Sequence, residues 1–146
     1  MSLTSQTVVK SVELPCSAAA AFAFLADGRN WPRFAIHNIF AIRPGDDGDW
    51  LIDTPRGPGR LRLRPDAASG ILDHEFIDPR EGRWDVPARV VPAGERAIFI
   101  MTLTRPTGMA ERDFVTGLAL LDDELATLQR LLAAPAEDRL GATAGG

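Results

Sequence analysis

The stretch ERDFVTGLALLDDELATLQRLLA, residues 111–133, contains the clearest periodic pattern in the chain. Its apolar residues recur at alternating steps of four and three, at Phe114, Leu118, Leu121, Leu125, Leu128 and Leu132. This spacing places them on one face of an α-helix of about six turns. Gly117 interrupts the pattern at a cost of about 1 kcal/mol relative to alanine, so it either permits a close backbone approach or is tolerated. The stretch predicts a long amphipathic helix with one buried side.

A strand and two short helices are predicted near the start of the chain. Thr7–Leu14 alternates like a half-buried strand. Ala18–Ala26 is rich in alanine and predicts a helix, which Gly28 is expected to end in the left-handed conformation. Asn30 is then expected to cap a second short helix, with Pro32 in its first turn. The sequence therefore predicts a helix–turn–helix corner rather than one long helix.

Short strands separated by tight turns are predicted in the middle of the chain. Glycine, proline and aspartate mark the turns, as in RPGDDGD at 43–49 and DPREG at 78–82. The predicted strands are residues 39–43, 50–54, 60–64, 71–77, 84–91 and 97–104. Strands at this spacing, joined by short turns, are typical of an antiparallel meander.

This order of elements predicts an α+β fold. A curved antiparallel sheet of six or seven strands would wrap around the long C-terminal helix, and the two short helices would brace one end. A sheet packed against a single long helix leaves a space between the two layers. The length of 146 residues suits one domain, residues 1–146, with flexible tails expected at 1–5 and 136–146.

Charge and composition disfavour several classes of protein. The net charge of −4 argues against nucleic acid or an anionic membrane as the main partner. Cys16 is the only cysteine, so no internal disulfide can form, and a reducing cytoplasm is the expected compartment. The longest apolar run, residues 18–26, is far shorter than the ~20 residues of a membrane span.

The alternation of the strands predicts which side chains face the helix. The inward sets are Trp50 and Ile52; Leu61 and Leu63; Leu72, His74 and Phe76; Trp84, Val86, Ala88 and Val90; and Phe99, Met101 and Leu103. His74 is the best candidate for a catalytic acid or base, because the unperturbed pKa of imidazole lies near neutrality. The alternative is a hydrogen-bonded interior histidine without a catalytic role.

The remaining motifs have structural alternatives that we favour. His37 is expected near the mouth of the interior space, as a ligand contact or as a structural histidine. Trp31 and Phe34 are expected to anchor the corner to the sheet, and also lie near that mouth. No metal is expected, because adjacent residues on a strand point to opposite faces and keep His74 away from its acidic neighbours. The RLRLR segment at 60–64 is expected to be a solvated strand face rather than an anion site.

The chain resembles the START/Bet v 1-like superfamily, also labelled SRPBCC or polyketide cyclase/dehydrase, which has the helix-grip fold. The segments that carry the resemblance appear in the family's order and span nearly the whole chain. They are SVELPCSAAAAFAFLADGRNWPRFAIH at 11–37, GILDHEF at 70–76, WDVPARVVP at 84–92, FIMTLTRPTGM at 99–109 and LATLQRLL at 125–132.

The resemblance implies an apolar cavity between the sheet and the long helix. We expect it to bind a small hydrophobic or aromatic molecule, lipid- or polyketide-like, without a cofactor. The residues expected to contact the ligand are Trp31, Phe34, His37, Trp50, Leu61, Leu63, His74, Phe76, Trp84, Val86, Phe99, Met101, Phe114, Leu118 and Leu121. Two alternatives remain open: a cyclase or dehydratase in which His74 moves a proton, and a protein-interaction module with a filled core. A homodimer is also compatible with the sequence.

Overall fold

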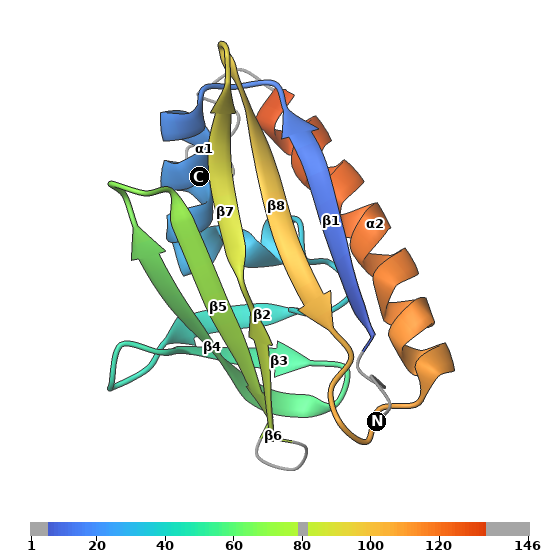
Figure 1. Ribbon diagram of the computed structural model, residues 1–146. Coiled ribbons are helices and arrows are strands. Elements are labelled where there is room, and N and C mark those ends of the chain that lie inside the picture. The colour runs from blue at the N-terminus through green and yellow to red at the C-terminus, as the bar shows by residue number, and fades with distance from the viewer. Residues whose placement is uncertain (1–5, 79–81, 134–146) are drawn as a thin grey trace.

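The computed structural model describes residues 6–78 and 82–133, so the predicted tails lie outside the described residues. It confirms the α+β architecture, with one large antiparallel sheet and a long C-terminal helix (Figure 1). In chain order the elements are β1 (Thr7–Leu14), α1 (Ala18–Ala26), the 3-10 helix η1 (Gly28–Arg33), β2 (Ala41–Pro44), β3 (Trp50–Thr54), β4 (Gly57–Asp66), β5 (Ile71–Asp78), β6 (Gly82–Val86), β7 (Ala88–Ala93), β8 (Arg96–Thr104) and α2 (Glu111–Ala133).

The strands lie in the order β1-β8-β7-β5-β4-β3-β2, with β6 paired to β5. The sheet curves so strongly that β2 and β3 cross the lower part of Figure 1, while β8 and β1 stand steeply beside each other and run in opposite directions. Both α-helices lie behind the strands in that view, and α2 runs alongside β1. No helix in the described part of the chain is long and apolar enough to cross a membrane.

Within residues 6–78 and 82–133 the sheet has eight strands, one more than the sequence predicted, because the predicted strand 84–91 is interrupted at Pro87. Proline has no N–H to donate to a neighbouring strand. The N–H of the next residue, Ala88, donates instead to the Asp73 side chain at 3.0 Å. Beyond the break, β7 pairs with β8. The interruption therefore separates β6, which pairs only with β5, from the part of the chain that continues the main sheet.

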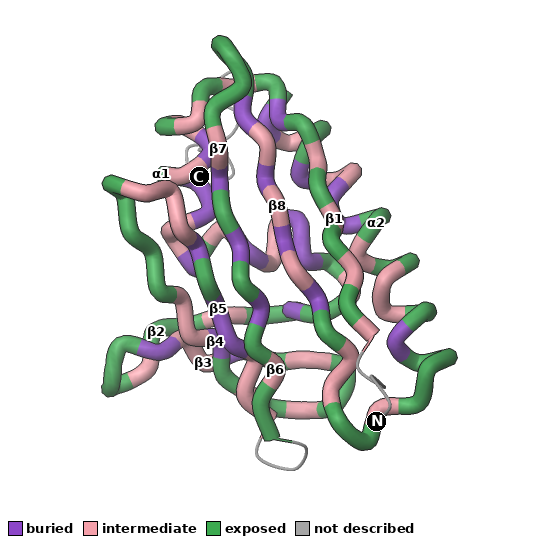
Figure 2. The backbone as a smooth tube through the Cα atoms, viewed as in Figure 1, coloured by how far each residue is buried: buried purple, intermediate pink, exposed green. Residues whose placement is uncertain are grey.

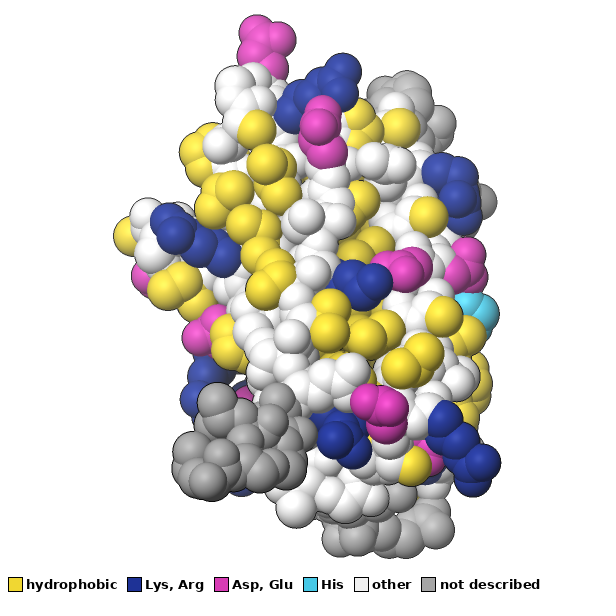
Figure 3. All heavy atoms as spheres, turned by 45° about the vertical axis from the view of Figure 1, so that its right-hand side comes forward, with side chains coloured by type: hydrophobic (Ala, Val, Ile, Leu, Met, Phe, Trp, Pro, Cys, Tyr) yellow, Lys and Arg dark blue, Asp and Glu magenta, His cyan; other side chains and the backbone are white. Residues whose placement is uncertain are grey.

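The predicted alternation of inward and outward side chains is confirmed. Buried positions recur every second residue along β8, as Figure 2 shows. The core includes Leu61, Leu72, His74, Val86, Ala88, Val90, Phe99, Met101, Leu103 and Phe114. The convex outer face stays partly apolar, and Val9 there is 62% exposed. Figure 3 shows apolar side chains on part of this face, with acidic and basic groups scattered among them.

The helix–turn–helix corner forms where predicted, but by different contacts. Asp27 rather than Asn30 caps η1, because its side chain accepts a hydrogen bond from the N–H of Arg29 at 3.0 Å. Gly28 does not have a positive φ, which corrects the left-handed ending expected for α1. It is needed for another reason: the Trp50 indole lies against the position that a Cβ would occupy.

We expect Gly28→Ala to destabilise the protein by about 1–3 kcal/mol, because the new methyl group would overlap the Trp50 ring and force it to move. Gly117→Ala is the matched control. A Cβ at Gly117 would meet no atom within 4 Å, so alanine should stabilise α2 by about 1 kcal/mol. Urea denaturation of both variants measures the difference. Equal effects of the two substitutions would contradict this account of Gly28.

Candidate functional site

The interior between the sheet and the helices is centred on a group of aromatic rings. Trp31 reaches it from η1, and its indole lies edge-on to His74 with ring centroids 4.8 Å apart. The centroid of the Trp31 ring is also 5.2 Å from that of Phe34 and 6.5 Å from that of Phe76. Its Nε1–H donates to the carbonyl of Leu25 at 2.9 Å. Trp31 therefore anchors the corner to the sheet, as the sequence predicted, and Phe34 is buried against the Trp31 ring.

His74 lies in the middle of this aromatic group and is 1% exposed. Its Nδ1 lies 2.9 Å from the carbonyl oxygen of Leu72. A carbonyl only accepts, so Nδ1 carries the proton and Nε2 presents a lone pair. Burial lowers the pKa of the imidazole to about 4, against smaller opposing effects of the Leu72 carbonyl and Asp73. His74 is therefore neutral at pH 7, and its catalytic role stays a prediction that this pKa does not favour.

Trp84 supplies a second polar atom to the same inner face. Its ring lies 6.3 Å from that of Phe114, the first buried residue of α2. Its indole Nε1 is buried and has no hydrogen-bond partner in the described structure, and the same is true of His74 Nε2. The sequence predicted Trp84 only as an apolar wall. Its inward position on the strand next to His74 was a signal that the indole N–H would also face the interior.

Several apolar residues on the strands and on α2 pack against the buried core without being fully covered. Five apolar residues pack against the buried core while remaining only half-buried, and we call them the half-buried wall: Leu63, Phe76, Trp84, Leu118 and Leu121. The first three lie on β4, β5 and β6, and the last two on the first half of α2. The second half of α2 is tightly packed, with Leu125, Leu128 and Leu132 buried.

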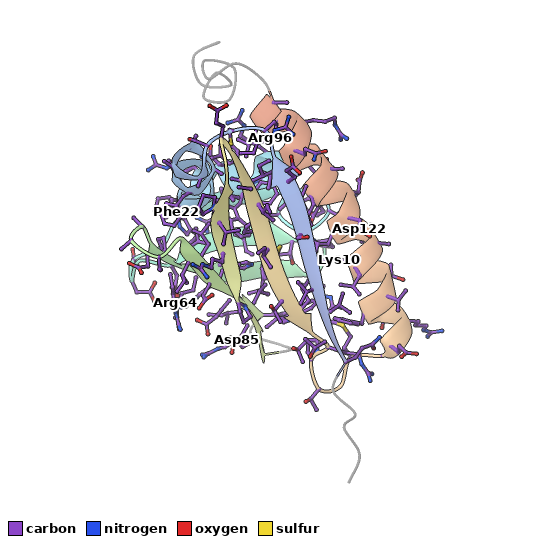
Figure 4. The ribbon with its side chains drawn as sticks, turned by 45° about the horizontal axis from the view of Figure 1, so that its top comes forward. Lys10, Phe22, Arg64, Asp85, Arg96 and Asp122 are labelled. Atoms are coloured by element: carbon purple, nitrogen blue, oxygen red, sulfur yellow. The ribbon has the colours of Figure 1, made fainter. Side chains whose placement is uncertain are left out.

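An ion pair ties β1 to this first half of α2. The ammonium group of Lys10 lies 2.9 Å from the carboxylate of Asp122, next to Leu121 in the sequence. Figure 4 shows these two side chains between the strand and the helix. Lys10 shares the inner face of β1 with Val8 and Val12, so its aliphatic stem covers apolar surface while its charge reaches the helix.

His37 does not belong to the interior. Its Nε2 lies 2.6 Å from the Asp123 carboxylate, and its backbone N–H donates to Glu124 at 2.9 Å. Glu124 also accepts from the Asn38 amide at 3.1 Å and is 3% exposed. Burial raises the pKa of Glu124, while these hydrogen bonds oppose the rise. The predicted ligand contact at His37 is instead part of a structural junction with α2, and sequence reasoning missed Glu124.

Trp50 is also placed away from the half-buried wall. Its indole lies between Gly28 and the guanidinium of Arg29, whose Cζ is 5.8 Å from the ring centroid. Trp50 therefore joins β3 to the corner. The other residues predicted to contact a ligand are buried in the core: Leu61, Val86, Phe99, Met101 and Phe114.

The RLRLR segment forms an outward-facing ion-pair network. Arg62 donates to both oxygens of the buried Asp49, at 2.8 and 2.9 Å, and these bonds lower the pKa of Asp49. Glu75 is buried on the outer face between Arg64 at 2.6 Å and Arg83 at 3.2 Å. Each of these arginines faces an acid, so the outward strip is ion-paired. The sequence predicted an outward, solvated strand face here but not the buried acids that pair with it.

A hollow of about 330 Å³ on the surface lies where the ends of β1, β8 and α2 meet. Glu13, Pro15, Arg96, Gln129, Arg130 and Ala133 line it. Its polar groups are paired with one another: Arg96 with Glu13 at 2.7 Å, and Gln129 with the Glu13 carbonyl at 2.8 Å.

Comparison with known proteins identifies the fold. No protein-family model matches the sequence, and no curated protein matches it either. Among solved structures, a START superfamily protein from Mycobacterium smegmatis superposes with a TM-score of 0.66 at 14% identity, covering 87% of this chain and 97% of that one. The chain has the helix-grip fold of the START/Bet v 1-like superfamily.

Two further helix-grip structures are enzymes by name. The di-domain aromatase/cyclase BexL from the BE-7585A biosynthetic pathway matches with a TM-score of 0.69 at 18% identity, over 89% of this chain and 48% of that one. A norcoclaurine synthase mutant from Thalictrum flavum, in complex with a transition state analogue, matches with a TM-score of 0.63 at 12% identity. The match covers 91% of this chain and 97% of that one. At these identities the likeness is one of fold, which does not determine activity.

Proposed function

We propose that the protein binds a small, largely apolar molecule between the first half of α2 and strands β4–β6. The observation that carries this proposal is the half-buried wall. Its five apolar residues, on β4, β5, β6 and the first half of α2, pack against the buried core while remaining only half-buried. The ring centroids of Trp84 and Phe114 are 6.3 Å apart, which places β6 close to the start of the helix. Covering such a surface gains about 25 cal/mol per Å² of apolar area.

The site is only partly formed when empty, so binding requires a small outward shift of α2. We expect the stretch around Leu118 and Leu121 to shift most, because these two residues are less buried than Phe114 before them and Leu125 after them. The helix-grip structure of norcoclaurine synthase with a transition state analogue supports the proposal, since it shows this fold holding a small molecule. His74 and Trp84 would be the polar contacts.

The neutral fluorophore N-phenyl-1-naphthylamine tests the proposal, because its emission rises in apolar surroundings. We expect saturable binding to the wild-type protein. Leu118→Trp fills the space at the wall and should weaken binding at least about tenfold. Leu120→Trp is the matched control, since Leu120 is on the same helix, is 37% exposed and lies outside the wall. No saturable emission, or equal binding by the two variants, would contradict the proposed site.

A further inference from the structure

Two buried polar atoms face the interior without a protein partner: Nε2 of His74 and Nε1 of Trp84. Buried polar atoms in proteins are nearly always hydrogen-bonded, and each exception calls for an explanation. The third such atom in the described structure, Oε1 of Gln6, lies before β1 and outside this region. Unlike Gln6, His74 and Trp84 lie on the same face of two paired strands, β5 and β6.

The strand register brings the two residues together. His74 pairs with Val86, and Phe76 pairs with Trp84, so His74 and Trp84 are diagonal neighbours on the inner face. Diagonal neighbours have Cα atoms about 7–8 Å apart, which aromatic side chains can span. Apolar rings surround both: the His74 ring lies 4.8 Å from Trp31 and 5.7 Å from Phe76, and the Trp84 ring lies 6.3 Å from Phe114.

The two atoms have opposite hydrogen-bonding character. The bond of His74 Nδ1 to the Leu72 carbonyl, at 2.9 Å, leaves Nε2 as an acceptor. Its low pKa, caused by burial, keeps the ring in this neutral form. Trp84 Nε1 can only donate. The site therefore presents one acceptor and one donor in an apolar setting, with no charge of its own.

We propose that the molecule bound at the half-buried wall carries a neutral hydroxyl group, as in an alcohol or a phenol. Its oxygen accepts a hydrogen bond from Trp84 Nε1, and its proton is donated to His74 Nε2. This inference rests on the proposed function and specifies the chemical class of ligand. A carboxylate, ether or ketone only accepts, so it would leave His74 unpaired, and a carboxylate would also bring an unpaired charge into an apolar interior.

A series of naphthalenes with one variable group tests this specificity. The affinities of 2-naphthol, 2-methoxynaphthalene, 2-naphthoate and 2-methylnaphthalene are measured by displacement of N-phenyl-1-naphthylamine. We expect 2-naphthol to bind at least about tenfold more tightly than 2-methoxynaphthalene, because it satisfies both buried atoms. We expect 2-naphthoate to bind most weakly.

Two variants assign the preference to the two side chains. Trp84→Phe and His74→Leu should each reduce the preference for 2-naphthol over 2-methoxynaphthalene to about twofold, whatever their effect on the affinity for 2-methylnaphthalene. Trp84→Phe is the safer variant, since that ring is only half-buried. Trp50→Phe is the matched control and should keep the full preference.

The series separates the two proposals. Equal binding of 2-naphthol, 2-methoxynaphthalene and 2-methylnaphthalene would overturn the hydroxyl inference and leave the proposed binding site intact. Failure of every compound and of the fluorophore to bind would overturn both. A preference for 2-naphthol that survives Trp84→Phe and His74→Leu would also overturn the inference, because another group would then hold the hydroxyl.

Discussion

Trp31→Ala is expected to lower the free energy of unfolding by about 3–5 kcal/mol, the range for removing a large buried aromatic side chain. Trp31 is 2% exposed, and its ring contacts Phe34 within the corner and His74 and Phe76 on β5. The substitution would leave a cavity where the corner meets the sheet, and it would remove the donor to the Leu25 carbonyl. A domain of this size has only about 5–15 kcal/mol of stability, so the loss is a large share of the total.

Urea denaturation at pH 7 measures this loss. Trp31→Phe is the intermediate case, because it keeps a ring among the aromatic residues but leaves the Leu25 carbonyl without its donor, at a cost of about 1–3 kcal/mol. Val115→Ala is the control, since Val115 lies on α2 and is 53% exposed. If Trp31→Ala were no more destabilising than Val115→Ala, Trp31 would not be the anchor that its contacts indicate.

The second large effect is expected in acid. The pKa of His74 is lowered from 6.5 to about 4 in the folded protein, mainly by burial, and returns to its ordinary value on unfolding. Between these pH values the unfolded chain binds the proton more readily, so stability falls as the pH falls. The difference between the pKa values of the unfolded and folded states corresponds to a loss of about 3 kcal/mol in the free energy of unfolding, at 1.36 kcal/mol per pKa unit. Above pH 6.5 His74 should contribute no pH dependence.

The measurement is the free energy of unfolding at pH 7, 6, 5 and 4 for the wild type and for His74→Leu. Glu124 acts in the opposite direction, because its pKa is raised in the folded protein and its protonation there favours folding in mild acid. Both proteins contain Glu124, so the difference between their pH profiles isolates the contribution of His74. Parallel profiles would show that His74 is not buried in its neutral form.

The sequence predicted the elements whose patterns are local and repetitive. The steps of four and three from Phe114 to Leu132 correspond to the helix Glu111–Ala133, and the alternation in β8 correctly identified Phe99, Met101 and Leu103 as core residues. These patterns arise because one face of each element is buried, and a periodic sequence reports that face directly.

The contacts between distant elements could not be read from such patterns. Gly28 lies where the sequence predicts a helix to end, yet a side chain there is excluded by Trp50, a residue of β3. In the sequence Glu124 does not differ from the other polar residues of α2, yet it is buried and accepts a hydrogen bond from the backbone N–H of His37. The unpaired Nε1 of Trp84 depends on a strand register that the sequence does not encode locally. In each case the deciding partner is far away in the chain.

The ion pair between Lys10 and Asp122 has a consequence for how copies of the protein meet. β1 is one border of the open sheet, and such a border exposes N–H and C=O groups to which another chain could add a strand. A strand added there would extend the concave face and press apolar side chains against the charged end of Lys10. The opposite border, β2, has only four residues and ends in Pro44. Both borders are thus poor templates for the addition of a strand from another copy.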